Sequence, residues 1–317
     1  MYPTLIEYQG IGFHTWGLMV MMAFFAAFML VSARARKVGI DSDNLVPLYM
    51  LVSIFGLVGA RLLHFVFAEP ASFFGNPLVF FDMGQGGFAF LGGVIGGVVS
   101  GALYAWRNNI PVWKLADIAA AAIMLALAVG RTGCFFAGCC HGSPWHTAHA
   151  ESGEPVAIID TLLSLPGGSV VSVEDFPGIA LTFKQGVGVG AVFDTPLYPT
   201  QLLEITAGLT IFTILSIMWK RFRKFDGQII AGMLVLYALA RFNIEKLRGD
   251  SVRGVDYFGM FSTSQLVSIG MVFTALIIVA VRFRAGVGSE VPIIDDEEYS
   301  DEDSDEDLEG DAREDAV

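Results

Sequence analysis

Long apolar runs recur along this chain, separated by shorter polar or charged stretches. A helix of about 20 apolar residues is long enough to cross the hydrocarbon core of a bilayer. Such runs lie at about 14–33, 45–67, 87–106, 114–131, 199–219, 228–247 and 262–282. The pattern therefore predicts an all-α polytopic membrane protein with seven transmembrane helices.

Two parts of the chain do not fit this pattern. Residues 132–198 are too polar to span a membrane, and we expect a small extracytoplasmic cap with some strand, for example at 178–183. Residues 286–317 are strongly acidic, a composition typical of disorder. The predicted organisation is a seven-span membrane domain over residues 1–285 and a disordered acidic cytoplasmic tail over residues 286–317.

Charge is distributed unevenly along the chain. The formal net charge is −13, but residues 288–317 hold 15 of the 32 acidic residues and one of the 19 basic ones. The rest, with 17 acidic against 18 basic residues, is nearly neutral. Only 16% of all residues are charged, against about 25% in an ordinary soluble domain. No basic stripe is present, so we expect membrane lipids and no nucleic acid as partners.

Basic residues alternate between the connecting loops, which predicts the orientation in the membrane. Lys and Arg are concentrated at 34–37, 107–114, 220–224 and 282–284. The 68–86 loop has no Lys or Arg, and segment 132–198 has only Lys184. Because basic loops stay in the cytoplasm, the N-terminus is predicted outside and the C-terminus inside.

Charged side chains gather near the outer ends of the predicted helices. With a rise of about 1.5 Å per residue, Arg61, Arg131 and Arg241 lie roughly 20 to 25 Å along spans that start in the cytoplasm. Gln201 and Glu204 lie at a similar depth on a span that starts outside. Such residues form internal ion pairs or mark a function. Guanidinium groups suit phosphate well, so this convergence favours a phospholipid headgroup site.

One predicted helix carries four polar residues on a single face. Tyr237, Arg241, Glu245 and Arg248 follow the spacing i, i+4, i+8, i+11, and Arg241 and Glu245 are suited to an ion pair.

All three cysteines lie in one motif, GRTGCFFAGCCHG at 130–142. Their odd number argues against a disulfide framework. A single disulfide outside the cytoplasm and a soft-metal site remain open alternatives. Small packing residues are the favoured interpretation, and we predict no metal and no cofactor.

Several motifs, in this order, make the chain resemble the bacterial prolipoprotein diacylglyceryl transferase family over roughly residues 12–270. They are GLVGARL (56–62), GGFAFLGGVIGG (86–97), GRTGCFFAGCCHG (130–142), YPTQLLE (198–204), DGQ (226–228), YALARFNIEKLRGD (237–250) and STSQ (262–265). The resemblance implies transfer of the diacylglyceryl group of phosphatidylglycerol to the lipobox cysteine of a prolipoprotein signal peptide. A thioether forms and glycerol phosphate is released. It also implies the bacterial cytoplasmic (inner) membrane, with the active site toward the periplasmic side.

The site residues follow from this resemblance and from the depth argument. Arg131, Arg241, Gly142 and Glu245 match positions of the family motifs. The expected catalytic residues are Arg131, Arg241, Glu245 and His141. The expected substrate-binding residues are Arg61, Gly142, Gln201, Glu204, Tyr237 and Arg248.

The chain departs from the commonest family pattern at Trp16, Leu91, Cys134 and Tyr198. Leu91 stands where many relatives have a histidine that is a proposed general base. We therefore expect a thiolate favoured by nearby arginines, with Glu245 or His141 accepting the proton.

Two other functions fit parts of the pattern. A divergent or inactive relative would bind phospholipid without transferring it. A transporter would place polar groups near the midplane of repeated halves, whereas here they gather toward one face and no repeat is evident.

Overall fold

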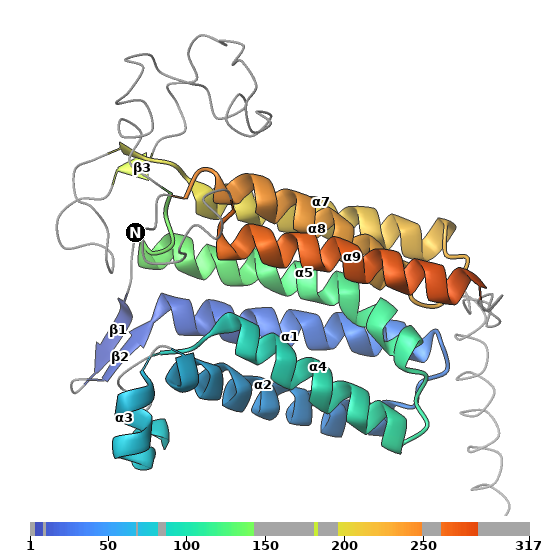
Figure 1. The fold of residues 1–317 in the computed structure, drawn as a ribbon, viewed down its shortest axis with the longest axis horizontal. Helices are drawn as coiled ribbons and strands as arrows, with labels where there is room; N and C mark the ends of the chain where they lie inside the picture. Colours follow the sequence, from blue (N-terminus) through green and yellow to red (C-terminus); the bar gives the residue numbers. More distant parts are fainter. Residues whose placement is uncertain are drawn as a thin grey trace, which may run out of the picture. The chain divides into compact units, whose positions relative to one another are not determined.

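The computed structural model describes residues 4–8, 11–67, 69–81, 87–142, 181–182, 196–248 and 261–284. Within these ranges, seven helices are long and apolar enough to cross a membrane (Figure 1). They are α1 (Thr15–Arg36), α2 (Leu45–Phe67), α4 (Phe90–Arg107), α5 (Val112–Ala137), α7 (Thr200–Arg221), α8 (Gln228–Glu245) and α9 (Thr263–Arg284). The predicted all-α polytopic fold is confirmed.

Short elements join or precede these helices. The helical ones are η1 (Ser42–Asn44), α3 (Pro70–Gly75) and η2 (Pro77–Phe81). Strand β1 (Thr4–Tyr8) pairs antiparallel with β2 (Ile11–His14), and β3 (Leu181–Thr182) pairs antiparallel with β4 (Pro196–Leu197). Strand β3 lies within the predicted strand at 178–183. Most of the predicted cap and the acidic tail lie outside the described residues, and their assignment stays a prediction.

One helix boundary differs from its prediction in a way that affects the site. The apolar run suggests an end near residue 131, but α5 continues to Ala137. Hydropathy falls at Arg131, although an arginine with a buried counterion does not interrupt a helix. Arg131 therefore lies inside α5, and Cys134 lies one turn further along the same face.

The chain forms two compact units, which we describe separately. One comprises Met1–Leu30 and Ala116–Glu290, and contains most of α1 and α5 together with α7, α8 and α9. The described part of the other, within residues 31–115, contains α2, α3 and α4.

In the second unit, α2 and α4 pack closely through glycines (Figure 1). A Cβ atom added at Gly59 or Gly92 would overlap the carbonyl oxygen of the other residue. A Cβ at Gly96 would overlap the carbonyl oxygen of Phe55. The glycine ladder of α4 therefore lets the two backbones approach each other, as small residues do in membrane helix pairs.

In the first unit, a buried carboxylate fixes the start of α8. The backbone N–H groups of Gly227, Ile229 and Ile230 donate to Asp117 of α5 over 2.9, 3.0 and 3.0 Å. The first N–H groups of a helix lack intrahelical partners, so Asp117 caps α8 from another helix and complements its dipole. Gly227 has a φ of +99°, which explains the glycine of the DGQ motif.

Replacing Asp117 with alanine should lower the free energy of unfolding by about 2 to 4 kcal/mol, because three N–H groups and the nearby Arg223 lose a partner. Thermal unfolding in detergent measures the effect. Asp43→Ala, at an exposed position, is the control. Equal melting temperatures for the two variants would refute the capping role.

Candidate anion site formed by α5, α7, α8 and α9

Glu204 of α7 is the centre of an ionic cluster in the first unit. Its carboxylate forms ion pairs with the Nε atom of Arg131 from α5 and with a terminal nitrogen of Arg241 from α8, the latter at 2.7 Å. Arg248, just after α8, contacts the same carboxylate at 3.3 Å. Three segments therefore direct a guanidinium group at one buried acid.

A second carboxylate holds Arg241 from the other side. Glu245, one turn further along α8, forms an ion pair with Arg241 at 2.7 Å. Arg241 also donates to the Ser264 hydroxyl of α9 at 3.2 Å, and the Ser262 hydroxyl donates to Glu245 at 3.5 Å. With three arginines and two acids, the cluster carries one excess positive charge.

The three arginines differ in accessibility. The side chain of Arg131 is 18% exposed and that of Arg241 is 12% exposed, against 2% for Arg248. Arg131 contacts Glu204 through its Nε atom. Arg131 is therefore the arginine best placed to meet an incoming anion. Arg248 is buried and contacts Glu204 from within the protein.

A narrow hollow adjoins the cluster, and the surface that it exposes is apolar. It is lined by Leu127, Glu204, Ala207, Tyr237, Ala240, Arg241 and Ile244. An apolar surface suits the apolar part of a ligand. The hollow's volume of about 10 Å³ leaves room for at most one water, so a larger ligand must displace side chains.

The residues before and at the start of α7 hold the loop that follows α5. Thr200 and Gln201 are fully buried and donate to the backbone carbonyls of Cys140 and Cys139, over 2.9 and 2.8 Å. The N–H of Gly142 donates to the carbonyl of Tyr198 at 2.9 Å. Gln201, expected at the substrate, therefore contacts this loop. Thr200 and Ser264 were not among the expected site residues, although they lie in the YPTQLLE and STSQ motifs.

Gly142 occupies a place where no side chain fits. A Cβ atom there would lie 2.6 Å from Cβ of Tyr198 and 2.7 Å from the carbonyl oxygen of Leu247. The preceding residue, His141, is partly buried, with its Nδ1 atom 3.0 Å from the carbonyl oxygen of Gly142. The glycine that closes the motif is thus explained by packing of the loop.

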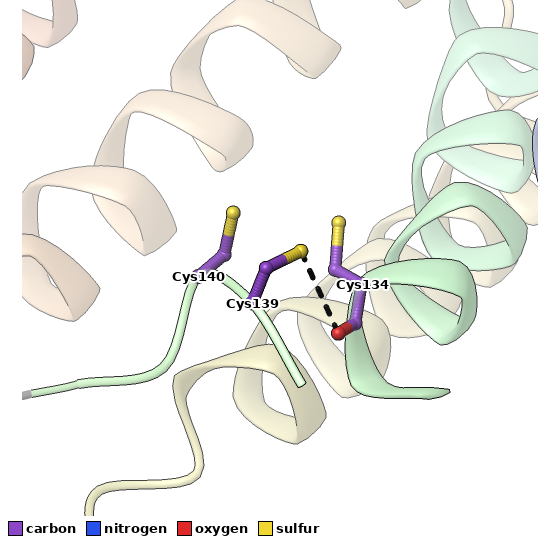
Figure 2. Close-up of side chains that lie close together, drawn as sticks. All are labelled: Cys134, Cys139 and Cys140. Carbon is purple, nitrogen blue, oxygen red and sulfur yellow. Dashed lines mark hydrogen bonds between the residues drawn. The ribbon is translucent and has the colours of Figure 1, made fainter. Parts of the chain in front are cut away.

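The three cysteines of the motif come together as free thiols (Figure 2). Their Sγ atoms all lie within 4.8 Å of one another, and the Cys139 thiol donates to the carbonyl of Cys134 at 3.7 Å. Hydrogen bonds from the thiols of Cys134 and Cys139 lower the pKa of Cys140, and the guanidinium groups of Arg131 and Arg248 lower it further. Hydrogen bonds with the thiols of Cys134 and Cys140 raise the pKa of Cys139.

Arg61 lies in the second unit and has a local set of partners. It is 1% exposed and donates to the backbone carbonyls of Phe80, Gly87 and Val79, over 3.2, 3.0 and 3.3 Å. Its guanidinium also stacks 4.7 Å from the ring centre of Phe65. These contacts fix the backbone at Val79, Phe80 and Gly87, and the expected role of Arg61 in substrate binding stays a prediction.

Within the described residues, seven helices able to span a membrane and a net positive cluster at one end of four of them define a polytopic membrane protein with a candidate site for an anionic group. Sequence comparison makes the class specific. The profile of the family described as prolipoprotein diacylglyceryl transferase matches residues 3–281, and the chain belongs to this family.

Several relatives carry the name phosphatidylglycerol–prolipoprotein diacylglyceryl transferase. The protein from Clostridium tetani is 28% identical over 289 residues, which cover 90% of this chain and 99% of the relative. A second form from Clostridium perfringens is 28% identical, covering 83% and 88% of the two chains. The Bacillus cereus protein is also 28% identical, covering 86% and 88%.

Gly142→Ala should lower the free energy of unfolding by about 1 to 3 kcal/mol, because the added methyl group displaces Tyr198 or Leu247. It should also make the thiols of the neighbouring loop react faster with a thiol reagent. Gly130→Ala is the matched control, since a Cβ there meets nothing within 4 Å. Equal melting temperatures and thiol reactivity in both variants would contradict the packing role.

Proposed function

We propose that this protein transfers the diacylglyceryl group of phosphatidylglycerol to the lipobox cysteine of prolipoproteins. A thioether forms and glycerol phosphate leaves, as the first step of lipoprotein maturation. One observation carries the proposal: three arginines from α5, α8 and the segment after α8 meet at Glu204, in a chain of this family. The proposed location is the bacterial cytoplasmic (inner) membrane, with the site toward its periplasmic side, as the basic loops favour.

Arg131 and Arg241 are the proposed phosphate ligands. Both are partly exposed, and both carry a planar guanidinium that can hold two phosphate oxygens at once. The bond that breaks joins a glycerol carbon to a phosphate oxygen, so negative charge grows on that oxygen in the transition state. A fixed positive cluster in a site poor in water stabilises this charge strongly.

Glu204 is the proposed internal counterion of the empty cluster. Three buried guanidinium groups without an acid would repel one another and carry a large desolvation cost. Glu204 keeps them in place before the lipid arrives. The phosphate then shares the arginines with Glu204, which is consistent with the excess positive charge of the cluster.

The hollow beside the cluster gives the proposed path for the lipid. Its exposed surface is apolar, and Leu127 and Ile244 are in its lining beside Arg241 of the cluster. An apolar surface next to the arginines suits acyl chains whose headgroup reaches the cluster. The hollow must widen when the headgroup enters, because it holds about one water in this state.

Proton removal from the acceptor thiol needs a group other than the histidine of many relatives. Leu91 is apolar and accepts no proton. Glu245 is the proposed acceptor nearest the arginines, since it forms an ion pair with Arg241. His141 is the second proposed acceptor, in the same loop as Cys139 and Cys140.

A divergent relative that binds phospholipid without transfer is the alternative, motivated by Leu91. The purified protein with phosphatidylglycerol and a lipobox peptide separates the two functions. Glycerol phosphate release together with a lipidated peptide supports the transferase. Lipid binding without release at any pH from about 6 to 9, around the thiol pKa, supports the alternative.

Arg131→Ala and Arg241→Ala should each reduce transfer by about a hundredfold to a thousandfold, because each removes a phosphate contact in the transition state. Lysine should restore little, since a point charge does not hold two oxygens at once. Release of glycerol phosphate by purified variants measures the effect. The control is Arg107→Ala, at an exposed position at the end of α4. Near-normal transfer by Arg241→Ala would contradict the assignment.

We propose that the acidic residues 286–317 take no part in transfer, because the basic loops place them on the opposite side of the membrane from the arginines. Deleting residues 290–317 should leave the turnover number within about twofold of wild type. The assay is normalised to the amount of protein in the membrane. A large loss of turnover at equal protein level would assign the tail a role in the enzyme.

A further inference from the structure

The three cysteines have the spacing of a metal ligand set. Their Sγ atoms lie within 4.8 Å of one another, and Figure 2 shows the side chains of Cys134 and Cys140 on either side of Cys139. Three thiolates bound to one zinc ion at about 2.3 Å lie about 3.8 to 4.0 Å apart. The cluster therefore needs only a small contraction to hold such an ion.

The backbone around the thiols is held by two hydrogen bonds from the start of α7. Thr200 and Gln201, both fully buried, bind the carbonyls of Cys140 and Cys139. Cys140 has a φ of +60°, a left-handed conformation that is uncommon for a residue with a side chain, and such residues cluster at functional sites. Close packing of small apolar residues requires neither feature.

The thiols also lie beside the cationic cluster. Arg131 and Cys134 are three residues apart on one face of α5, so one helix carries both a cluster arginine and a thiol of the group. His141 does not belong to the group of converging ligand atoms, and its Nδ1 atom lies against the carbonyl of Gly142.

We propose that Cys134, Cys139 and Cys140 bind one zinc ion whose fourth position receives the sulfur of the acceptor cysteine. Three protein ligands and one open position are the usual arrangement of a catalytic zinc site. This inference rests on the proposed function, because it assigns the acceptor thiol of that reaction to the open position. A zinc ion would also favour the thiolate form of the acceptor cysteine. This chain needs such help because Leu91 stands where many relatives have a histidine.

The chemistry of the step balances without an oxidant or a reductant. The acceptor thiol loses its proton to Glu245 or His141, the proposed acceptors, when its sulfur binds zinc, since a thiol bound to zinc is deprotonated. The sulfur then forms a bond to the glycerol carbon of the lipid. The bond from that carbon to the phosphate oxygen breaks, and its electron pair stays on the oxygen. Glycerol phosphate leaves from the arginines as an anion.

Metal content of the purified full-length chain tests the site directly. Zinc analysis of wild type should give about one ion per chain. Cys134→Ser, Cys139→Ser and Cys140→Ser should each weaken zinc affinity by more than about tenfold. His141→Ala is the matched control and should keep its zinc. Wild-type protein without zinc affinity, or with a disulfide within the cluster, would overturn the proposal without any need for the variants to fold.

Cobalt substitution tests the open position. Wild type loaded with Co²⁺ should show sulfur-to-cobalt charge-transfer absorption, which should rise when a lipobox peptide is added. A peptide with serine in place of the cysteine should leave the absorption unchanged. An equal response to the two peptides would show that the acceptor sulfur does not reach the metal, and would overturn its assignment to the fourth position.

Chelation separates this inference from the proposed function. Removal of zinc should reduce transfer at least about tenfold, and added Zn²⁺ should restore it. Full transfer by zinc-free protein would overturn the metal's role while leaving the transferase function intact. A zinc-bound protein that responds to the peptide but releases no glycerol phosphate would support the metal site and reject the proposed function.

Discussion

The ion pairs of Glu204 are the interaction on which the site depends. In a membrane protein, three guanidinium groups at neighbouring positions are stable only when an acid lies among them. Glu204 meets Arg131, Arg241 and Arg248, and so joins α7 to α5, to α8 and to the segment after α8. The same contacts order the proposed binding site before any lipid is present. A preorganised cluster needs little rearrangement when charge develops on a leaving phosphate.

The helices were predictable from the sequence because hydropathy is a local property. Each predicted apolar run corresponds to one long helix of the structure. The end of α5 was not predictable in this way, because the tolerance of Arg131 inside a helix depends on Glu204, which lies far away in the sequence. The role of Asp117 as the cap of α8 also depends on a distant contact and has no local signal.

The positions of the charged residues along the helices were predictable from the sequence, but most of their contact partners were not. The spacing of Arg241 and Glu245 placed both on one face, and the structure forms that ion pair. Their similar depth led to the same expected role, substrate binding, for Arg61, Gln201 and Glu204. Their contacts in the structure differ. Glu204 bridges arginines, Gln201 binds a loop carbonyl, and Arg61 binds backbone carbonyls of its own unit. A side chain's partner depends on rotation and packing of helices, which one sequence does not record.

Displacement at carbon is faster when the nucleophile is activated and the leaving group is stabilised. Helix α5 carries residues of both groups of side chains proposed for these tasks. Arg131 and Cys134 lie one turn apart on the same helix, so α5 connects the ionic cluster of arginines to the three thiols. The loop after α5 adds Cys139 and Cys140, and α7 holds that loop while also supplying Glu204. A lipid phosphate on the arginines and an acceptor sulfur at the thiols would therefore lie close together. Such proximity accounts for a substantial part of the barrier reduction in a bimolecular transfer.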